Sequence, residues 1–508
     1  MGSDIAQGSS YRIARNTIAL YIRMLTSMLV SLYTSRVVLS ALGVDDYGIY
    51  NVVTGFVLAF GFLNSAMNVS VQRFLTVEFE KHDPQRLNHI FSLSLVMHVV
   101  IAIIMVVVTE TVGLYFLENR MVIPPDRIGA ARWVFQFSVV SLFFSILNVP
   151  YRALMVTYEH MGSFAVISLF EVFAKLLVAF ALPYVKVDRL LIYGLMLAVV
   201  SVVLQIIYVV VCKARYKEAT FHRFTWDRTL LKDMCGFAGW NLIGVFAGIA
   251  QNQGVNVVLN IFGGPAVNAA RAISFQVGGA ANQLVTNFQL AVTPPLMKQY
   301  ASRTGSAEAL IFSSSKISFI LIMFVIIPVY VMCPEILSLW LETVPDHAVA
   351  FTRIVLLDSL IGSLAGPLHT LFQATGKISR YQMVISGILL LNLPLAYIML
   401  RNGCSYNSVF VLAVILTFVT LICRLVMIRK YVNVNLMNFT LKVIVPCTLL
   451  AGAVYAITYG VTALGNGTSS DIVIVIAVSA TSIVAFAWLF AMTDDERALV
   501  KSILRSRR

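Results

Sequence analysis

The stretch VVLSALG at residues 37–43 closes one long apolar segment, and a near copy, VVLNIFG at residues 257–263, closes another. Four of the seven positions are identical, and each copy is followed by a turn and a helix rich in small residues. Because the two copies occupy equivalent places along the chain, the repeat predicts a fold built from two related halves.

Composition places both halves in a membrane. Hydrophobic residues make up 59% of the 508 residues and charged residues 12%, and the mean hydropathy is +0.85. A single soluble core could not bury so much apolar surface. Apolar stretches of about 20 residues recur along the chain, and each is long enough to cross a hydrocarbon layer as a helix. Helices suit that environment because they satisfy their own backbone hydrogen bonds.

These stretches predict an all-α integral membrane protein of about 14 transmembrane helices. We expect the helices near residues 16–39, 48–71, 90–117, 130–154, 162–184, 189–212, 233–261, 267–292, 310–331, 350–373, 379–400, 406–428, 439–464 and 469–491. Prolines inside four of the segments predict kinks there. These prolines are Pro150, Pro328, Pro367 and Pro394.

Basic residues sort by side of the membrane. Successive connections between the predicted helices lie on alternate sides of the membrane. Those on one side, with the two termini, carry 26 of the 37 Lys and Arg residues, those on the other side carry 7, and 4 lie inside helices. Positive residues stay on the cytoplasmic side, so we expect both termini to be cytoplasmic. The net charge of +13 therefore reflects topology rather than nucleic-acid binding. The six cysteines have no metal-binding spacing, so neither a metal nor another cofactor is expected.

The repeat and the connections divide the chain into parts. We expect an N-lobe of helices 1–6 at residues 1–212, a basic cytoplasmic linker at 213–232, a C-lobe of helices 7–12 at 233–430, and helices 13–14 with a basic cytoplasmic tail at 431–508. Parallel repeats of this kind build transporters whose substrate site lies between the two halves.

Two helical hairpins of the chain resemble a known family. The first, at residues 35–74, carries LG at 42–43, DYG at 46–48, Tyr50 and RF at 73–74. The second, at residues 262–302, leaves helix 8 through Pro294 and Pro295. Both resemble the polysaccharide and O-antigen flippase branch of the multidrug, oligosaccharidyl-lipid and polysaccharide exporter (MOP) superfamily. Relatives of that branch are the lipid II flippases and the multidrug and toxin extrusion transporters.

The resemblance implies a function. A member of this branch would flip an undecaprenyl-pyrophosphate-linked oligosaccharide, such as an O-antigen, capsule or exopolysaccharide repeat unit, to the outer leaflet by alternating access. It would lie in the bacterial inner membrane among membrane lipids and work with other polysaccharide-assembly proteins. A cation-coupled multidrug exporter of the same superfamily is the alternative. A membrane glycan polymerase or ligase is less favoured, because the short outer loops carry no nucleophile or base constellation, and no enzyme activity is expected.

Three cations inside helices are candidates for binding the pyrophosphate. Arg271 lies about one turn into helix 8, and at 100° per residue Asn282 and Gln289 share its face. Guanidinium binds phosphate oxygens bidentately, although an arginine at this place could instead snorkel to the outer interface. Arg23 in helix 1 and Lys175 in helix 5 are the other two cations.

Amide side chains form stripes on helices 7 and 8 and are candidates for lining a cavity. They are Asn241, Asn252 and Asn256 on helix 7, and Asn282 and Gln289 on helix 8. Sugar hydroxyls need uncharged donors and acceptors, which amides supply. Amides also fasten membrane helices to one another, so the pattern favours both roles almost equally.

Three further ionisable residues are candidates for coupling transport to sodium, protons or the membrane potential. Glu171 lies one turn before Lys175, a spacing that also suits an ion pair within helix 5. Asp358 and His369 are 11 residues apart in helix 10 and would share one face of a straight helix, where they could relay protons. Pairing with Arg353 is the alternative for Asp358.

Overall fold

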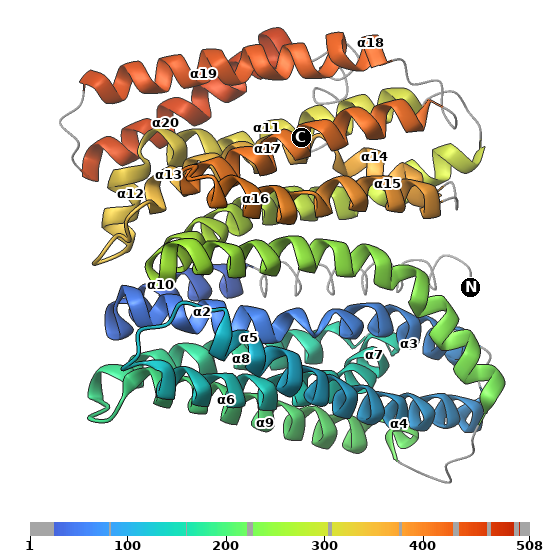
Figure 1. Cartoon of the computed structure of the whole chain (residues 1–508). Helices are drawn as coiled ribbons and strands as arrows, with labels where there is room; N and C mark the ends of the chain where they lie inside the picture. The colour runs from blue at the N-terminus through green and yellow to red at the C-terminus, as the bar shows by residue number, and fades with distance from the viewer. Residues whose placement is uncertain are drawn as a thin grey trace. The chain divides into compact units, whose positions relative to one another are not determined.

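Helices form the secondary structure of the described chain. The computed structural model describes residues 25–80, 83–158, 160–220, 227–302, 307–374, 378–429, 436–464, 469–491 and 497. Within these ranges there is no β-strand, and most connections are short (Figure 1). The chain divides into two compact units, Met1–Ala269 and Ala270–Arg508, which are described separately below.

The first described helix of the first unit covers Leu25–Leu42. The helices that follow are α2 (Val44–Ala59), α3 (Phe62–Glu80), α4 (Pro84–Val108), α5 (Leu114–Asn119), α6 (Ile128–Leu147), α7 (Val149–Thr157), α8 (Met161–Ala181), α9 (Arg189–Arg215) and the first part of α10 (Arg228–Ser302). A π-helical turn at Thr109–Gly113 joins α4 to α5, so that Pro84–Asn119 forms one long span.

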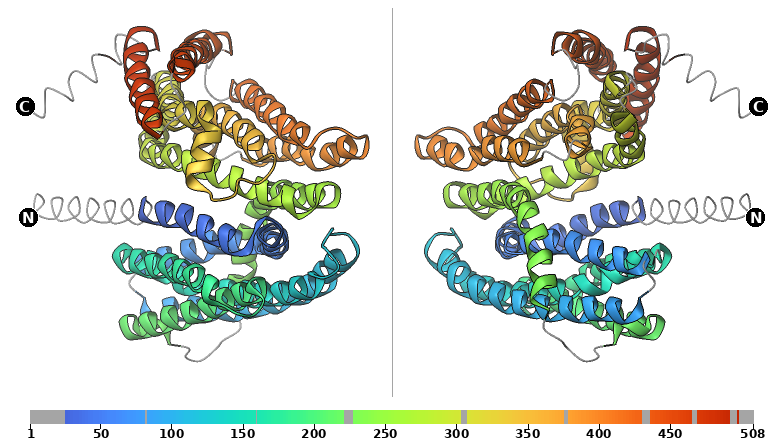
Figure 2. Two further views of the ribbon diagram at one scale, coloured as in Figure 1. Left: turned by 90° about the vertical axis from the view of Figure 1, so that its left-hand side faces the viewer. Right: turned by 90° about the vertical axis from the view of Figure 1, so that its right-hand side faces the viewer.

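The second unit contains the rest of α10 and all later helices. These are α11 (Ala307–Val331), α12 (Cys333–Trp340), α13 (Ala348–Ser363), α14 (Gly366–Ala374), α15 (Ile378–Leu390), α16 (Asn392–Arg401), α17 (Tyr406–Ile428), α18 (Leu436–Phe439), α19 (Val445–Leu464) and α20 (Ser469–Phe486). The last two long helices, α19 and α20, pack against each other and against α11 (Figure 2).

The number of membrane spans can be compared with the sequence prediction. Ten described helices are long and apolar enough to cross a membrane, and the bent pair α13–α14 makes eleven if it counts as one span. The segments α2, α3 and α10 are not among them, yet they are helical where helices 2, 7 and 8 were expected. The all-α membrane fold is therefore confirmed, while the full number of 14 spans and the lobe boundaries stay predictions.

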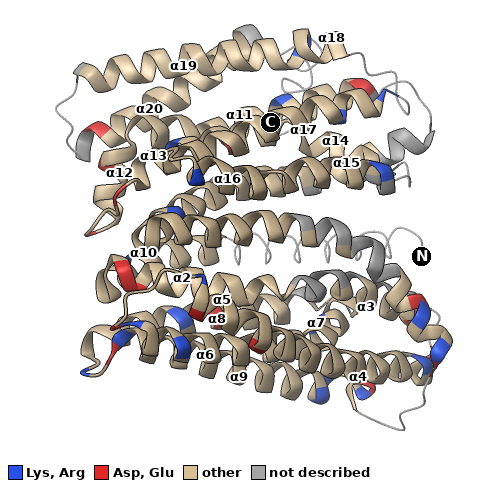
Figure 3. Ribbon diagram, viewed as in Figure 1, with Lys and Arg blue, Asp and Glu red and all other residues tan. Residues whose placement is uncertain are grey.

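Most charged residues lie towards the ends of the helices in each unit, and long stretches between them carry no charge (Figure 3). The helix ends are also where acidic caps occur. Asp83 accepts hydrogen bonds from the backbone N–H groups of Gln85 and Arg86 and begins α4, and Asp188 does the same for Leu190 and Leu191 at α9. Such caps satisfy donors that a helix cannot pair internally.

The sequence repeat corresponds to a repeated turn. Gly43 (φ 80°, ψ 172°) separates the first helix from α2, and Gly264 (φ 70°, ψ −173°) interrupts α10 after the second copy of the motif. Positive φ is readily adopted only by glycine, which explains the glycine at each turn. The two turns are 221 residues apart, whereas the sequence motifs are 220 residues apart, because the second motif ends at Gly263 and the second turn lies at Gly264, the next residue.

Proline-containing spans are broken at three of the four predicted places. The helix breaks before Pro150, between α6 and α7, before Pro367, between α13 and α14, and before Pro394, between α15 and α16. The axes of α13 and α14 differ by 45°. Pro328 lies inside α11, which continues through it.

Each unit has its own hydrophobic core. In the first unit, α2, α4 and α6 meet around Val53, Phe135 and Leu142, and α9 runs beside α6. Gly194 of α9 permits that close approach, since a Cβ there would lie 3.2 Å from a methyl group of Val134. In the second unit, α11 packs against α13 and α19 within the same core.

Candidate functional site

Arg271 lies in the second part of α10, two turns after Gly264. Its side chain is only 7% exposed, and its guanidinium carbon lies 4.0 Å from the centroid of the Phe275 ring. The Ser274 hydroxyl donates to the Arg271 carbonyl oxygen at 2.8 Å. A guanidinium over an aromatic face is held by a cation–π interaction, which is strongest where water is excluded. Arg271 is therefore a cation positioned within the protein by an aromatic ring one turn away.

The amide stripe below Arg271 contacts the bent helix pair α13–α14. Asn282 Nδ2 donates to Ser359 Oγ at 2.9 Å, and the Thr293 and Thr370 hydroxyl oxygens are 3.5 Å apart. Gln289 fills the space beside Gly366, where any Cβ would overlap its amide. The two residues of each pair are 77 positions apart in the sequence. The second part of α10 therefore runs parallel to the α13–α14 pair, and the register between them stays the same along the contact. Asn282 and Gln289 thus fasten helices together and remain partly exposed.

Asp358 and His369 have different neighbours. The Asp358 carboxyl group lies within hydrogen-bonding reach of Thr417 in α17, and its Oδ1 atom is buried without a hydrogen-bond partner among the described residues. His369 Nδ1 lies 3.0 Å from the Tyr381 hydroxyl of α15. The expectation that both residues share a face assumed a straight helix 10. That assumption is wrong, because the chain bends by 45° between them.

Glu171 and Lys175 form the intrahelical ion pair that their spacing predicts. Lys175 Nζ lies 2.6 Å from Glu171 Oε1, and the two side chains are 47% and 38% exposed. An exposed apolar stripe also runs along α8. Its members are Val166, Phe170, Phe173 and Leu177. At 100° per residue the ion pair lies about 150° from this stripe. An apolar face suits lipid, whereas an exposed ion pair in mid-span needs water or a polar ligand.

Asparagines before and after Gly264 in α10 surround the turn at this residue. Asn268 Nδ2 donates to both the side-chain and the backbone oxygen of Asn256 at 2.8 Å, and its Oδ1 accepts from Asn260 Nδ2 at 3.0 Å. Asn260 Oδ1 also accepts from the backbone N–H of Val122 at 2.8 Å. Asn256, Asn260 and Asn268 are buried, whereas Asn252 is exposed. The predicted lining residue Asn256 therefore has a structural partner in Asn268, and the side chain of the predicted lining residue Asn252 is exposed.

Two predicted residues cannot be placed. Arg23 lies outside the described residues, and Asn241 lies in α10 at a position whose side chain is not described.

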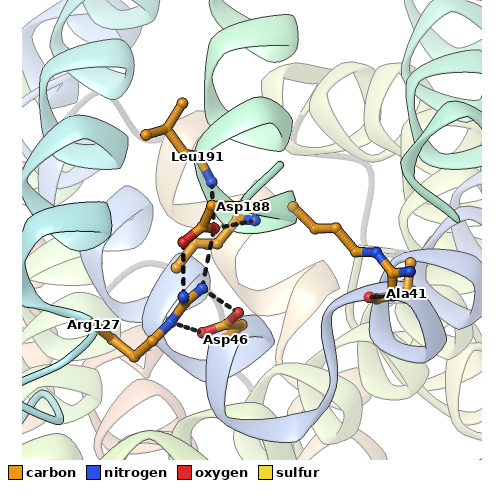
Figure 4. A network of polar contacts seen from close by, with 7 residues as sticks. Ala41, Asp46, Arg127, Asp188 and Leu191 are labelled. Carbon is orange, nitrogen blue, oxygen red and sulfur yellow. Dashed lines mark hydrogen bonds and ion pairs between the residues drawn. The ribbon is translucent and has the colours of Figure 1, made fainter. Parts of the chain in front are cut away.

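An ion-pair network that sequence reasoning missed joins the starts of three helices of the first unit (Figure 4). Arg127 donates from Nε to Asp46 Oδ1 at 2.8 Å and from Nη1 to Asp188 Oδ2 at 2.7 Å, and its Nη2 reaches a second oxygen of each carboxylate. Arg189 donates to the Ala41 carbonyl oxygen at 3.0 Å beside it. One guanidinium thus bridges the starts of α2, α6 and α9, and we name Asp46, Arg127 and Asp188 the Arg127 clamp.

The two carboxylates of the Arg127 clamp titrate differently. Burial tends to raise the pKa of Asp188, but hydrogen bonds from Arg127 and from the backbone of α9 outweigh burial and hold this pKa below its usual range. Burial dominates at Asp46 and raises its pKa despite the same arginine. The sequence offered one signal for this network, because Asp46, Arg127 and Asp188 all lie in connections predicted on the same side of the membrane.

Comparisons with known proteins identify the fold. No protein-family model matches the chain, and no curated protein sequence matches it. The structure of the lipid II flippase MurJ in an inward closed conformation matches with a TM-score of 0.70 and 12% identity, covering 93% of this chain and 98% of that one. An inward-facing multidrug resistance MATE family transporter of the MOP superfamily matches with a TM-score of 0.68 and 14% identity, covering 82% and 97%.

A third solved structure also matches this chain. A MOP superfamily transporter from Pyrococcus furiosus gives a TM-score of 0.61 and 15% identity, covering 82% of this chain and 95% of that one. These structural neighbours are transporters and flippases, not enzymes. The chain therefore has the MOP superfamily fold that its hairpins resemble, and identities this low establish the fold alone.

Proposed function

We propose that this chain is a transporter that flips an undecaprenyl-pyrophosphate-linked oligosaccharide from the cytoplasmic to the outer leaflet by alternating access. The observation that carries the proposal is the fold match to a lipid II flippase over 93% of this chain and 98% of the flippase. The proposal includes the bacterial inner membrane, cytoplasmic termini, and two six-helix lobes followed by two C-terminal helices. Other polysaccharide-assembly proteins are its proposed partners.

The chemistry of the candidate residues supports a substrate with a diphosphate group. Arg271 keeps its guanidinium over Phe275 in a buried position, where a charge-assisted hydrogen bond to a phosphate oxygen is strong. Lys175 presents an ammonium group on the face of α8 opposite the apolar stripe. The exposed Asn252 offers an uncharged donor and acceptor for sugar hydroxyls. A phosphate group competing for Lys175 would open its ion pair with Glu171.

A cation-coupled multidrug exporter is the second candidate. The match to a MATE family transporter, at a TM-score of 0.68, favours it. Asp358 supplies a carboxyl group with one unpaired buried oxygen among the described residues, which is suited to a coupling cation. The two candidates differ in the charge of the substrate, since the flippase moves an anion and the exporter an organic cation.

A flipping assay in proteoliposomes separates the two. The purified protein is reconstituted with a short-chain, fluorescently labelled polyprenyl-pyrophosphate sugar, and loss of fluorescence to an external quencher reports transfer between leaflets. We expect Arg271→Ala to slow transfer at least tenfold, the effect of losing about 1.4 kcal/mol of binding. Arg353→Ala is the matched control, because Arg353 also lies over an aromatic ring, 5.7 Å from the centroid of Tyr330.

The outcomes are distinct. Transfer at similar rates by the wild type and the Arg353 variant, with transfer by the Arg271 variant at least tenfold slower, supports the proposed flippase. No transfer of the lipid-linked sugar, together with uptake of ethidium driven by a sodium or proton gradient, would replace it with the drug exporter.

A further inference from the structure

Two arginines contact the first turn of α8 from neighbouring helices. Arg215, the last residue of α9, donates from Nη1 to Ser163 Oγ. Arg152 of α7 places its guanidinium carbon 5.5 Å from the centroid of the Phe164 ring. Both arginines are exposed, and neither forms an ion pair with a carboxylate in the part of the chain that the structure describes. Two cations therefore adjoin consecutive residues of one helix without a matching negative charge.

Their position along the spans places these cations at the depth of lipid headgroups. Arg215 ends the apolar span Arg189–Arg215, Ser163 is the second residue of the span Gly162–Tyr184, and Arg152 lies in the last turns of the span Ile128–Thr157. Three spans thus end at one level. The distribution of basic residues predicts this end to be cytoplasmic, where anionic lipids attract basic side chains.

An exposed apolar surface begins directly below the two arginines. Val166, one turn after Ser163, is 67% exposed, and Phe170, Phe173 and Leu177 continue the stripe along α8. At 100° per residue, Ser163 lies about 60° from Val166, so Arg215 lies near the head of the stripe. An exposed apolar stripe of this length in mid-span is suited to acyl chains, whereas a soluble anion would gain nothing from it.

We propose that Arg152 and Arg215 bind the phosphate of an anionic phospholipid whose acyl chains lie along the exposed stripe of α8. Guanidinium groups suit this ligand, because each can donate two hydrogen bonds to phosphate oxygens. The Ser163 hydroxyl holds one guanidinium in place, and the Phe164 ring supports the other. This lipid site lies in the first unit and does not depend on the identity of the transported substrate.

Native mass spectrometry of the full-length protein tests the site. The protein is released from nanodiscs that contain phosphatidylglycerol diluted in phosphatidylcholine, and bound lipids are counted as the phosphatidylglycerol fraction rises. Each basic residue near an anionic surface contributes about 1 kcal/mol, which is roughly fivefold in affinity. The double variant R152A/R215A should therefore weaken the tightest phosphatidylglycerol site by about 30-fold.

Matched controls separate a lipid site from general charge effects. R132A also removes an exposed arginine, which pairs with Glu118 at 2.8 Å near the opposite end of α6, and it should leave the site unchanged. R152K/R215K keeps the charge but loses the bidentate geometry, so it should weaken binding less than the alanine pair. The melting temperature of each variant in phosphatidylcholine alone reports whether it is folded.

Two results would overturn the proposal. Equal phosphatidylglycerol binding by the wild type and by a folded R152A/R215A variant would show that the arginines hold no lipid. Stabilisation of the detergent-solubilised protein by inorganic phosphate, to the same extent as by phosphatidylglycerol and lost in the same variant, would reassign the arginines to a soluble anion. Stabilisation by phosphatidylglycerol alone supports the lipid site.

Discussion

Replacing Arg127 by methionine should destabilise the first unit more than removal of any exposed arginine. Methionine keeps most of the apolar volume of the side chain but deletes four hydrogen bonds and leaves Asp46 and Asp188 facing each other. The side chains of the three residues are 25%, 19% and 29% exposed, so water screens the pairs only in part. Partly exposed charge-assisted pairs contribute about 1–1.5 kcal/mol each, and we expect a total loss of about 2–3 kcal/mol.

Thermal unfolding of the protein in nanodiscs measures this loss. For a unit of this size, 1 kcal/mol corresponds to about 2–4 °C, so R127M should lower the melting temperature by about 5–10 °C. R132A is the control, because the Arg132–Glu118 pair is more exposed, at 55% and 35%, and should cost less than about 1 kcal/mol.

A double-mutant cycle identifies the cause of the loss. Asp188→Asn keeps an oxygen for the α9 cap but removes the charge that Arg127 contacts. If the clamp is the cause, R127M and D188N should be less destabilising together than the sum of the single changes. Additive effects, or a shift no larger than that of R132A, would refute the reasoning and show that the carboxylates are stabilised by water alone.

Three more predictions follow from the first unit. Because the pKa of Asp188 is lowered in the folded protein, its ionised carboxylate should stabilise the fold above about pH 4, and this stabilisation should be lost as the pH falls through the lowered pKa. Acidification should therefore lower the melting temperature of the D188N variant less than that of the wild type. Gly48→Ala should lower the melting temperature, because the added Cβ would overlap the Pro265 carbonyl oxygen. Gly129→Ala is its control: the Cβ added there has no atom within 4 Å, so this change should be neutral or stabilising in the same thermal scan. Asn268→Ala should cost about 2–4 kcal/mol, because it leaves buried polar partners unpaired, and accelerated hydrogen exchange around the Gly264 turn would report it.

The helices could be predicted from the sequence because one physical requirement dominates them. A span of about 20 residues must be apolar and hydrogen-bonded within itself, and both conditions are visible in a sequence. The turn after each copy of the repeat also depends on local chemistry, since Gly43 and Gly264, the residue that directly follows the second copy, each occupy a conformation that glycine adopts easily. Local chemistry was sufficient in each case.

The candidate site was harder to predict because its contacts are long-range. Arg127 was counted only as a loop cation, although its partners lie 81 and 61 residues away and come together only when three helical hairpins pack. The prediction that Asp358 and His369 share one face of helix 10 failed for the opposite reason. Their spacing was read on a straight helix, while the break before Pro367 turns the second half by 45°.

The same break gives the amide stripe of α10 a second role. Asn282 contacts Ser359 on α13, before the break, and Thr293 contacts Thr370 on α14, after it. A change in the angle between α13 and α14 must therefore stretch at least one of these contacts or move the second part of α10. Arg271 lies on the same helical segment, between Gly264 and Asn282, so a movement of that segment would also move the candidate cation. The amides that fasten this segment to α13 and α14 would therefore also help to position the candidate cation.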